Sequence, residues 1–308
     1  MTRGIALHEI TLDRAYAECR AIAKREAKNF YYSFVALPEP RRNAICAIYA
    51  FMRKADDLSD DESISRQERR RRIDAWLAEW HTASQGNDTA DLVFIAVRDA
   101  IHRFNIPLAL LDELVAGTTM DLEQTGDQVD TYATFDDLYR YCYLVASVVG
   151  LVCIRIFGYS DKRAEKLAEE TGIAFQLTNI LRDVEEDAER KRVYLPLDDL
   201  AAHHVSLDSL LQRKHGVPPT ENERALLASI GARAETFYQS AKELLPLIDR
   251  ESRPALWVLV RIYRGLLRRI RRADYDVFSR RTRVPGFQKM EILAVGLVWM
   301  AWVRLRAK

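Results

Sequence analysis

The sequence is poor in the residues that disulfide-rich domains, zinc modules and turn-rich β proteins need. It has four cysteines, and no two of them have CxxC spacing: Cys19, Cys46, Cys142 and Cys153. All four lie in apolar segments with helical periodicity, so we expect reduced thiols, with neither a disulfide framework nor a zinc site. Only 12 glycines and 9 prolines occur among 308 residues, which argues against a turn-rich all-β fold.

An excess of charge of one sign is also missing. The 46 basic and 45 acidic residues leave a formal net charge of +1, so we expect no nucleic-acid partner. The N-terminus has no apolar signal-peptide core, and the expected location is cytoplasmic. No two glycines are two positions apart, so the GxGxxG fingerprint of a Rossmann-type nicotinamide site is absent.

The longest apolar run, residues 292–303, is shorter than the roughly 20 residues that cross a bilayer. We prefer to interpret it as a helix packed on the core. A helix at the membrane surface is the competing interpretation, because basic residues flank the run and Trp299 and Trp302 suit an interface. The flanking residues are Lys289, Arg304, Arg306 and Lys308. Peripheral membrane contact through residues 289–308, at the inner face of the membrane, therefore stays open.

Apolar residues recur at three- and four-residue spacing along most of the chain, and strict alternation is never sustained. The pattern predicts an all-α fold in one domain, residues 1–308, with residues 195–220 as the most loop-like stretch. The predicted helices cover residues 11–36, 39–62, 66–84, 89–104, 107–124, 134–157, 161–188, 221–246, 254–276 and 287–306.

The first acidic motif follows an apolar helical stripe. Asp56 and Asp60 are four residues apart, so they share one helical face, and Tyr49 and Arg53 precede them on that face. Asp57 points further round the helix. A solvated acidic helix end is the plain interpretation. The apolar approach weakens it, because carboxylates beside a core face are costly to bury unless they are paired or bound to metal.

A second row of oxygen-bearing side chains steps along another predicted helix at spacings of three, four and four residues. Its members are Gln176, Asn179, Asp183 and Asp187, which fall within about 80° of arc, while Arg182 lies on the far side of the helix. An ordered row of amides and carboxylates is harder to explain as a solvated face.

Taken together, the two rows suit Mg²⁺ and a diphosphate. Mg²⁺ prefers oxygen ligands and commonly binds through one or two carboxylates and the phosphates of a substrate. Two facing rows could hold several ions, which would neutralise a diphosphate as it leaves carbon. One DDxxD alone is a weak signal, but a pair of rows in an all-helical chain is a stronger one.

Four stretches carry a resemblance to a known family. They are NFYYSFVALPEPRRNAICAIYAFMRKADDLSDD (29–61), YCYLVASVVG (141–150), AFQLTNILRDVEEDAERKRVYLP (174–196) and ADYDVFSRR (273–281). In these segments the chain resembles the squalene/phytoene synthases, which join two prenyl diphosphates head to head. The resemblance implies an isoprenoid-synthase helical bundle around a central cavity, with two aspartate-rich motifs that bind Mg²⁺-diphosphate.

The resemblance also implies roles for residues at matching positions. The implied metal ligands are Asp56, Asp60, Asn179, Asp183 and Asp187, and the four aspartates and Tyr49 are the implied catalytic residues. The implied substrate contacts are Lys28, Asn29, Tyr49, Arg53, Tyr141, Gln176, Arg182, Tyr263 and Arg280, with Arg281 as the alternative to Arg280.

On this resemblance we expect an Mg²⁺-dependent prenyltransferase that condenses two farnesyl diphosphates to presqualene diphosphate and on toward squalene. A phytoene synthase using geranylgeranyl diphosphate is an alternative. So is a hydroxysqualene synthase, because Asn29 stands where many relatives have Ser. A non-catalytic assembly or lipid-binding protein of the same fold is the alternative from another class. Use of NADPH is left open.

Overall fold

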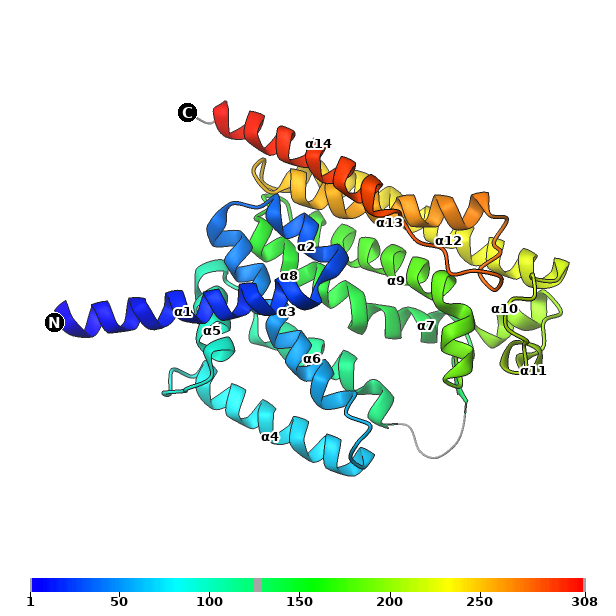
Figure 1. The fold of residues 1–308 in the computed structure, drawn as a ribbon, viewed down its shortest axis with the longest axis horizontal. Coiled ribbons are helices and arrows are strands. Elements are labelled where there is room, and N and C mark those ends of the chain that lie inside the picture. Colours follow the sequence, from blue (N-terminus) through cyan, green and yellow to red (C-terminus); the bar gives the residue numbers. More distant parts are fainter. Residues whose placement is uncertain (1, 124–128, 307–308) are drawn as a thin grey trace.

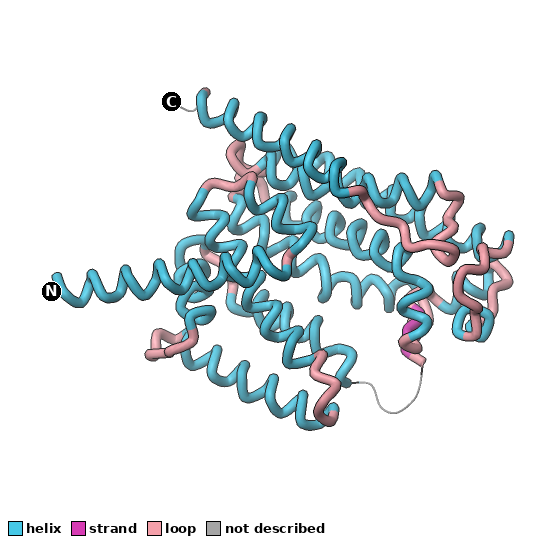
Figure 2. Tube along the Cα trace, viewed as in Figure 1, coloured by secondary structure: helices cyan, strands magenta, loops and turns pink. Residues whose placement is uncertain are grey.

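Helices make up nearly all the regular structure in the computed structural model (Figures 1 and 2). The model describes residues 2–123 and 129–306, with their side chains apart from residues 2–10, 28–30, 32, 121 and 123. The all-α prediction is confirmed. The helices are α1 (Thr2–Glu26), α2 (Lys28–Val35), α3 (Glu39–Ser59), α4 (Arg66–Ser84), α5 (Leu92–Phe104), α6 (Leu108–Glu123), α7 (Phe135–Cys142), α8 (Val148–Phe157), α9 (Arg163–Glu189), α10 (Leu197–Ala202), α11 (Leu207–Leu211), α12 (Glu221–Leu244), α13 (Arg253–Arg272) and α14 (Gly286–Leu305).

Several helices begin where a side chain satisfies the free backbone N–H groups of the first turn. Thr134 and Thr220 form capping boxes with the acidic residue three positions later, at the starts of α7 and α12. Asp91 accepts from two backbone N–H groups at the start of α5. These local signals explain why those three helix starts lie within three residues of the predicted ones.

Other boundaries differ from the prediction. The expected helix over 11–36 is two helices, α1 and α2, that break at the buried Ala27 without a proline or glycine to mark the place. The stretch 195–220 is not all loop, since it contains the short helices α10 and α11. The predicted helix 39–62 ends at Ser59, whose hydroxyl donates to the Thr118 carbonyl oxygen of α6 at 2.9 Å.

A pair of two-residue strands also escaped the sequence pattern. β1 (Asp130–Thr131) pairs in parallel with β2 (Arg192–Val193), shown in magenta in Figure 2. Two residues are too few to show a period of two. The pairing ties the chain just before α7 to the chain just after α9.

The predicted helix 134–157 is continuous but includes a π-helical segment, η1 (Tyr143–Ser147), between α7 and α8. Glycines of two neighbouring helices approach its backbone closely. A Cβ on Gly172 of α9 would lie 2.6 Å from Ser147 Cα, and one on Gly117 of α6 would lie 2.8 Å from the Leu144 carbonyl oxygen. Phe135–Phe157 is long and apolar enough to cross a membrane. Because it packs against α6 and α9 inside the bundle, we interpret it as a core segment.

Helix α9 runs through the middle of the bundle in Figure 1, with α12, α13, α8 and η1 packed against it. One apolar cluster fills the space among α1, α3, α5, α6 and α8, and a second surrounds α9, α12 and α13. The side of α9 that bears Thr178 packs against α12. Thr178 is fully buried, and its hydroxyl lies 2.9 Å from the Tyr238 hydroxyl of α12.

The cysteine prediction agrees with the structure. All four thiols are free, with three buried and Cys153 half-buried. Burial raises the pKa of Cys46 to about 11 and that of Cys153 to about 12. These thiols are protonated at neutral pH and serve as small apolar side chains.

Candidate functional site

The first acidic row lies where α3 ends. Asp56 occupies the last turn and is half-buried, while the exposed Asp60 stands one residue beyond the helix. The Asp60 backbone N–H donates to the Asp56 carbonyl oxygen at 2.8 Å, which keeps the two residues together although the helix is shorter than predicted. Arg69 of α4 donates to the Ser59 carbonyl oxygen at 2.9 Å and fixes this end of α3.

Burial raises the pKa of Asp56 to about 6, and the nearby charge of Asp60 adds to the rise. Arg53 forms an ion pair with the exposed Asp57, the residue after Asp56, with Nη2 at 2.5 Å from Oδ1. Tyr49 lies one turn before Arg53, and its ring meets Phe34 of α2 edge to face at a centroid distance of 6.2 Å. Tyr49, Arg53 and Asp56 follow one another along one side of α3, and the Arg53 guanidinium turns from this side to Asp57.

The second row lies along α9. The Asn179 amide donates to Gln176 Oε1 at a long 3.4 Å. Asn179 Oδ1 is buried and has no hydrogen-bond partner among the described residues. Burial raises the pKa of Asp187 to about 7, the charge of Asp183 adds to the rise, and Arg192 opposes it. An unpartnered oxygen and a carboxylate that is costly to ionise are features that a bound cation would relieve.

Asp183, between them, is paired with two arginines. Its Oδ1 accepts from Arg182 Nε at 2.8 Å and from Arg281 Nη2 at 2.8 Å. Arg281 also places Nη1 at 2.9 Å from Glu186 Oε1. The row on α9 therefore carries its own counter-charges.

The structure adds detail for two predicted arginines, whose contact with substrate stays a prediction. Helical spacing puts the Cβ of Arg182 on the far side of α9, and its long side chain turns back to Asp183, since the direction of Cβ does not fix the position of a guanidinium group. Of the two adjacent arginines, Arg281 reaches the row on α9, while Arg280 is exposed and makes no hydrogen bond or ion pair with a described residue. Both lie in the segment between α13 and α14, where no helical period indicates direction.

Aromatic rings flank the row on α9. Tyr263 of α13 is buried and stacks on Phe175 at a centroid distance of 4.5 Å. Burial raises the pKa of Tyr263 to about 12, against the opposing effects of Arg182 and of a hydrogen bond with Asn179. Tyr141 is buried as well, stacked on Tyr194 at 4.9 Å just after β2. Tyr141 and Tyr263, two of the three predicted tyrosines, thus lie among aromatic rings, and Tyr263 lies beside Arg182 and Asn179.

A hollow of about 410 Å³ opens beside Arg182 and Arg281. Its apolar wall includes Leu266 of α13 and Val284, and Lys289 of α14 completes the rim. Burial lowers the pKa of Lys289, and the charges of Arg182 and Arg283 lower it further. In the sequence, Lys289 is one of the basic residues that flank the C-terminal apolar run. Its side chain lines this hollow, a position that only the packing of α14 on α13 could reveal.

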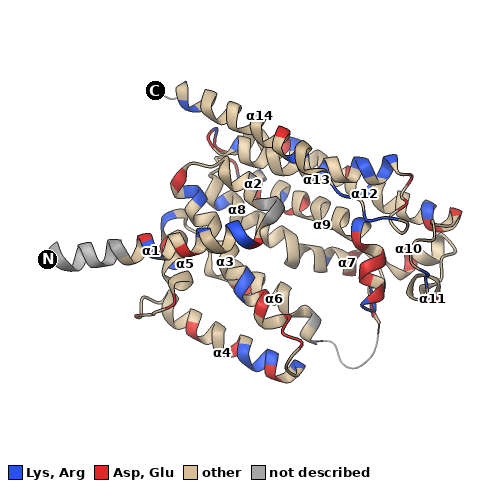
Figure 3. Cartoon of the chain, in the orientation of Figure 1, with Lys and Arg blue, Asp and Glu red and all other residues tan. Residues whose placement is uncertain are grey.

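Figure 3 marks acidic residues in red on the ribbon near the end of α3 and along the last turns of α9, which lie at the right of the view. Within residues 2–123 and 129–306, no hydrogen bond or ion pair joins the two rows. No three Asp, Glu, His or Cys side chains of these residues are gathered as a ready metal site. Each row offers oxygen ligands that need further ligands from a substrate. The side chains of Lys28 and Asn29 lie outside the described side chains.

Comparison with known proteins agrees with this geometry. Residues 23–288 match the family model described as squalene/phytoene synthase. The chain is 34% identical over 302 residues to the 15-cis-phytoene synthase of Synechococcus elongatus, which covers 94% of each protein. It is 34% identical over 287 residues to the phytoene synthase of Mycobacterium tuberculosis, covering 93% of this chain and 91% of that protein.

Solved structures lead to the same family. The fold superposes on a dehydrosqualene synthase in complex with ligand with a TM-score of 0.81 and 29% identity, covering 94% of this chain and 98% of that one. A squalene synthase from Alicyclobacillus acidocaldarius gives a TM-score of 0.78 and 26% identity, covering 87% and 97%. The chain belongs to the squalene/phytoene synthase family, whose members are prenyltransferases that condense prenyl diphosphates head to head.

Proposed function

We propose that this chain joins two molecules of farnesyl diphosphate head to head, giving presqualene diphosphate and then squalene. The row Asn179, Asp183 and Asp187 on α9, with Arg182 and Arg281 paired to its centre, is the observation that carries the proposal. Oxygen ligands for a cation, set beside guanidinium groups, suit a diphosphate that arrives with Mg²⁺. The kinship with a dehydrosqualene synthase and a squalene synthase supports the C15 substrate.

The residues present fit Mg²⁺. The candidate ligands offer only oxygen, the donor this ion prefers, and the buried Asn179 Oδ1 has no hydrogen-bond partner among the described residues. We propose that Asp56 and Asp60 hold the ion on the α3 side, and that Asn179, Asp183 and Asp187 hold it on α9. When bound, Mg²⁺ supplies positive charge that neutralises a leaving diphosphate.

In the proposed reaction one carbon–oxygen bond breaks, and diphosphate leaves with the electron pair. The freed carbon bonds to the double bond of the second substrate, and one proton is lost, which gives presqualene diphosphate. Squalene then requires that the second diphosphate leave and that a hydride be supplied by NADPH, the reductant added in the test below. Arg182 and Arg281 can turn their N–H groups from Asp183 to the diphosphate oxygens, because both are bidentate donors of fixed charge. In the absence of substrate, the same two arginines neutralise Asp183.

The aromatic rings have a separate role in this proposal. The stacked Tyr263 and Phe175 beside the α9 row, and Tyr49 and Phe34 beside the α3 row, offer ring faces that stabilise a passing carbocation. The phenol of Tyr263 is kept protonated at neutral pH, because burial raises its pKa to about 12. A neutral phenol does not trap the cation as a phenolate would.

One observation favours a second candidate, a phytoene synthase that joins two C20 geranylgeranyl diphosphates. The curated relatives that share 33–35% of residues over more than nine-tenths of this chain are phytoene synthases. The chemistry and the residues are the same in both candidates. They differ in the length of the apolar cavity that receives the prenyl tails.

The test is a set of incubations with radiolabelled C15 and C20 diphosphates, with Mg²⁺, in the presence and absence of NADPH. We expect a C30 cyclopropyl diphosphate from the C15 substrate without NADPH, and squalene when NADPH is added. A C40 product from the C20 substrate at a higher kcat/KM would replace the first candidate by the second, and hydroxysqualene without NADPH would replace its product. Release of no diphosphate from either substrate would leave the non-catalytic alternative.

A further inference from the structure

Helix α14 rests on the bundle by a narrow face. Only Leu293 and Gly296 of this helix are buried. A Cβ on Gly296 would lie 2.5 Å from Val258 Cγ2, so α14 meets α13 closely at this point. The helix thus packs on the core, as the preferred interpretation of the sequence expected, but most of its surface is left uncovered.

The uncovered side of α14 is apolar along its whole length. Phe287, Val298 and Leu305 are 72%, 70% and 77% exposed. At 100° per residue the exposed apolar residues form a stripe about 140° wide, interrupted by a single acid, Glu291. The stripe consists of Phe287, Met290, Ala294, Val295, Val298, Ala301, Trp302 and Leu305. A continuous apolar helix face of this size marks an interaction surface.

Basic side chains border the stripe on both sides. At the end of the helix, Arg304 and Arg306 project to opposite sides of the stripe, each about 100° from its centre line. The Arg306 guanidinium lies 3.8 Å from the centre of the Trp302 ring, so the charge is held at the edge of the apolar face. This arrangement of an apolar face with flanking cations is typical of helices that lie in the plane of a membrane surface.

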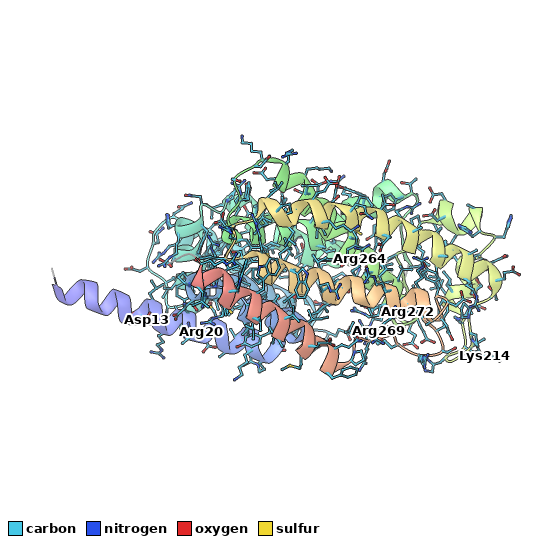
Figure 4. The ribbon with its side chains drawn as sticks, turned by 90° about the horizontal axis from the view of Figure 1, so that it is seen from above. Asp13, Arg20, Lys214, Arg264, Arg269 and Arg272 are labelled. Carbon is cyan, nitrogen blue, oxygen red and sulfur yellow. The ribbon has the colours of Figure 1, made fainter. Side chains whose placement is uncertain are left out.

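The groove between α14 and α13 supplies more positive charge. It has a volume of about 320 Å³, and its charged lining consists of one acid, Glu291 of α14, and four arginines of α13: Arg261, Arg268, Arg269 and Arg272. Figure 4 shows α13 and α14 side by side from above, with Arg269 and Arg272 labelled on α13. Arg269 donates to Gln288 Oε1 of α14 at 2.6 Å and bridges the groove.

Much of this charge is uncompensated. Arg268 and Arg272 are exposed and make no hydrogen bond or ion pair with any described residue, and the same holds for Arg271 one step round α13. The chain as a whole is nearly neutral, with a net charge of +1, whereas four arginines and one acid line this groove. The groove is therefore more positive than the average surface of the protein. Gly265 lines the groove without a side chain, and a Cβ there would meet nothing within 4 Å, so the space beside the arginines is open.

We infer that the outer face of α13 and α14 docks onto an anionic lipid bilayer. The apolar stripe of α14 enters the boundary between headgroups and acyl chains, and the arginines of the groove bind lipid phosphates. A second copy of this chain is a poorer occupant, because a symmetric contact through the same face would set the uncompensated arginines of the two copies against each other.

The position of this surface fits a water-insoluble product. Lys289, near the start of α14, forms part of the rim of the hollow beside Arg182 and Arg281. At 100° per residue Lys289 projects from the opposite side of α14 to the apolar stripe, so a docked bilayer would lie across this helix from the candidate site. The inference itself does not depend on which prenyl chain the protein uses.

The test is co-sedimentation of the full chain, without substrate, with vesicles of phosphatidylcholine alone or with one quarter phosphatidylglycerol. We expect binding to the anionic vesicles and at least tenfold weaker binding to the neutral ones. Val298→Glu puts a charge on the stripe and should lower the affinity at least tenfold. Val217→Glu is its matched control, since Val217 is also exposed, at 46%, but lies before α12.

The arginines are tested separately. Removing two cations that lie near an anionic surface should lower the affinity by about twenty- to thirtyfold, so Arg268→Gln with Arg272→Gln should bind that much more weakly. The matched control removes two exposed cations from α1, Arg14→Gln with Lys24→Gln, and should bind as the parent does.

Thermal melting of each variant confirms that the fold is kept, since all the changed side chains are exposed. Parent protein that fails to bind anionic vesicles would overturn the inference. So would Val298→Glu that binds as tightly as Val217→Glu. A parent dimer that Val298→Glu converts to a monomer, with no vesicle binding, would assign the face to self-association instead.

Discussion

Asp183 accepts hydrogen bonds from two guanidinium groups on one carboxylate oxygen. Arg182 reaches it from the neighbouring position on α9, and Arg281 reaches it from the segment that precedes α14. Removing one partner of such a network leaves charges without compensation, which is costly where side chains are partly buried. Substitutions at this point therefore separate a metal and diphosphate role from a purely structural one.

We expect Asp183→Asn to lower kcat/KM at least a hundredfold while the protein stays folded, at a lower melting temperature because Arg182 and Arg281 lose their counter-charge. The amide keeps the size of the side chain but loses the charge that would hold Mg²⁺. The measurement is turnover as a function of Mg²⁺ concentration. Asp57→Asn is the control, because Asp57 is an exposed carboxylate of α3 that pairs with Arg53 and is not one of the proposed metal ligands. Parent-like turnover of Asp183→Asn at limiting Mg²⁺ would remove this residue from the metal ligands.

The adjacent arginines 280 and 281 form a natural pair of test and control. Arg281→Gln should lower kcat/KM at least tenfold, since its guanidinium is the one beside Asp183, whereas Arg280→Gln should stay within about twofold of the parent. Steady-state kinetics with the prenyl diphosphate as varied substrate provide the measurement. Equal effects at the two positions would mean that the orientation of this segment differs in the working enzyme.

At the scale of elements, the close approach of η1 to its neighbours depends on two glycines, Gly117 of α6 and Gly172 of α9. The structure supports close packing for Ser147, which is fully buried against Gly172, and for Gly150, where an added Cβ would lie 3.1 Å from the Ala168 carbonyl oxygen.

Gly172→Ala should therefore destabilise the protein strongly, by more than about 2 kcal/mol, because the new methyl group would meet backbone atoms that cannot move independently. Thermal melting measures the effect. Gly265→Ala is the matched control, as another glycine within a helix whose added Cβ would meet nothing within 4 Å. Alanine is the better helix former there, so its melting temperature should stay the same or rise. A Gly172→Ala melting temperature equal to that of the control would contradict the close contact.

The elements also show how far the sequence alone could lead. Periodicity was sufficient to place α9 and α14, and periodicity with the capping box at Thr220 placed α12, because these signals are local. The break at Ala27, the π-helical turn and the two-residue strands depend on contacts between distant segments. In the site, the row on α9 followed from helical spacing. The choice of Arg281 and the inward position of Lys289 did not, because loop residues and helix packing have no period.

At the scale of the whole molecule, charge is distributed unevenly although the net charge is +1. Carboxylates gather at the ends of α3 and α9, and arginines gather on α13 and beside α14 (Figure 3). The carboxylates Asp56 and Asp187 are partly buried, and burial raises their pKa values to about 6 and about 7. Each carboxylate therefore binds its proton more tightly in the folded state than in the unfolded chain, whose reference value is 3.8.

The sign of the resulting pH dependence follows from proton linkage. Between about pH 4 and pH 7 the folded protein holds more protons at these two sites than the unfolded chain, so their contribution makes stability fall as pH rises. Well above pH 7 both carboxylates are ionised. Their desolvation, and the repulsion of Asp56 by Asp60 and of Asp187 by Asp183, then oppose folding in full. Mg²⁺ binds the ionised carboxylates, so it should stabilise the folded protein more at pH 8 than at pH 5.

Asp187→Asn isolates this contribution from those of the other ionisable groups. Without Mg²⁺, the difference in melting temperature between variant and parent should grow in favour of the variant from pH 5 to pH 8, by about 2 °C or more for a chain of this size. Asp57→Asn, which removes an exposed carboxylate, should keep the parent's pH profile. With Mg²⁺ at pH 8, the parent should gain stability that Asp187→Asn largely lacks. If Mg²⁺ raised both melting temperatures equally, the ion would be bound elsewhere. The high pKa of Asp187 would then reflect burial alone.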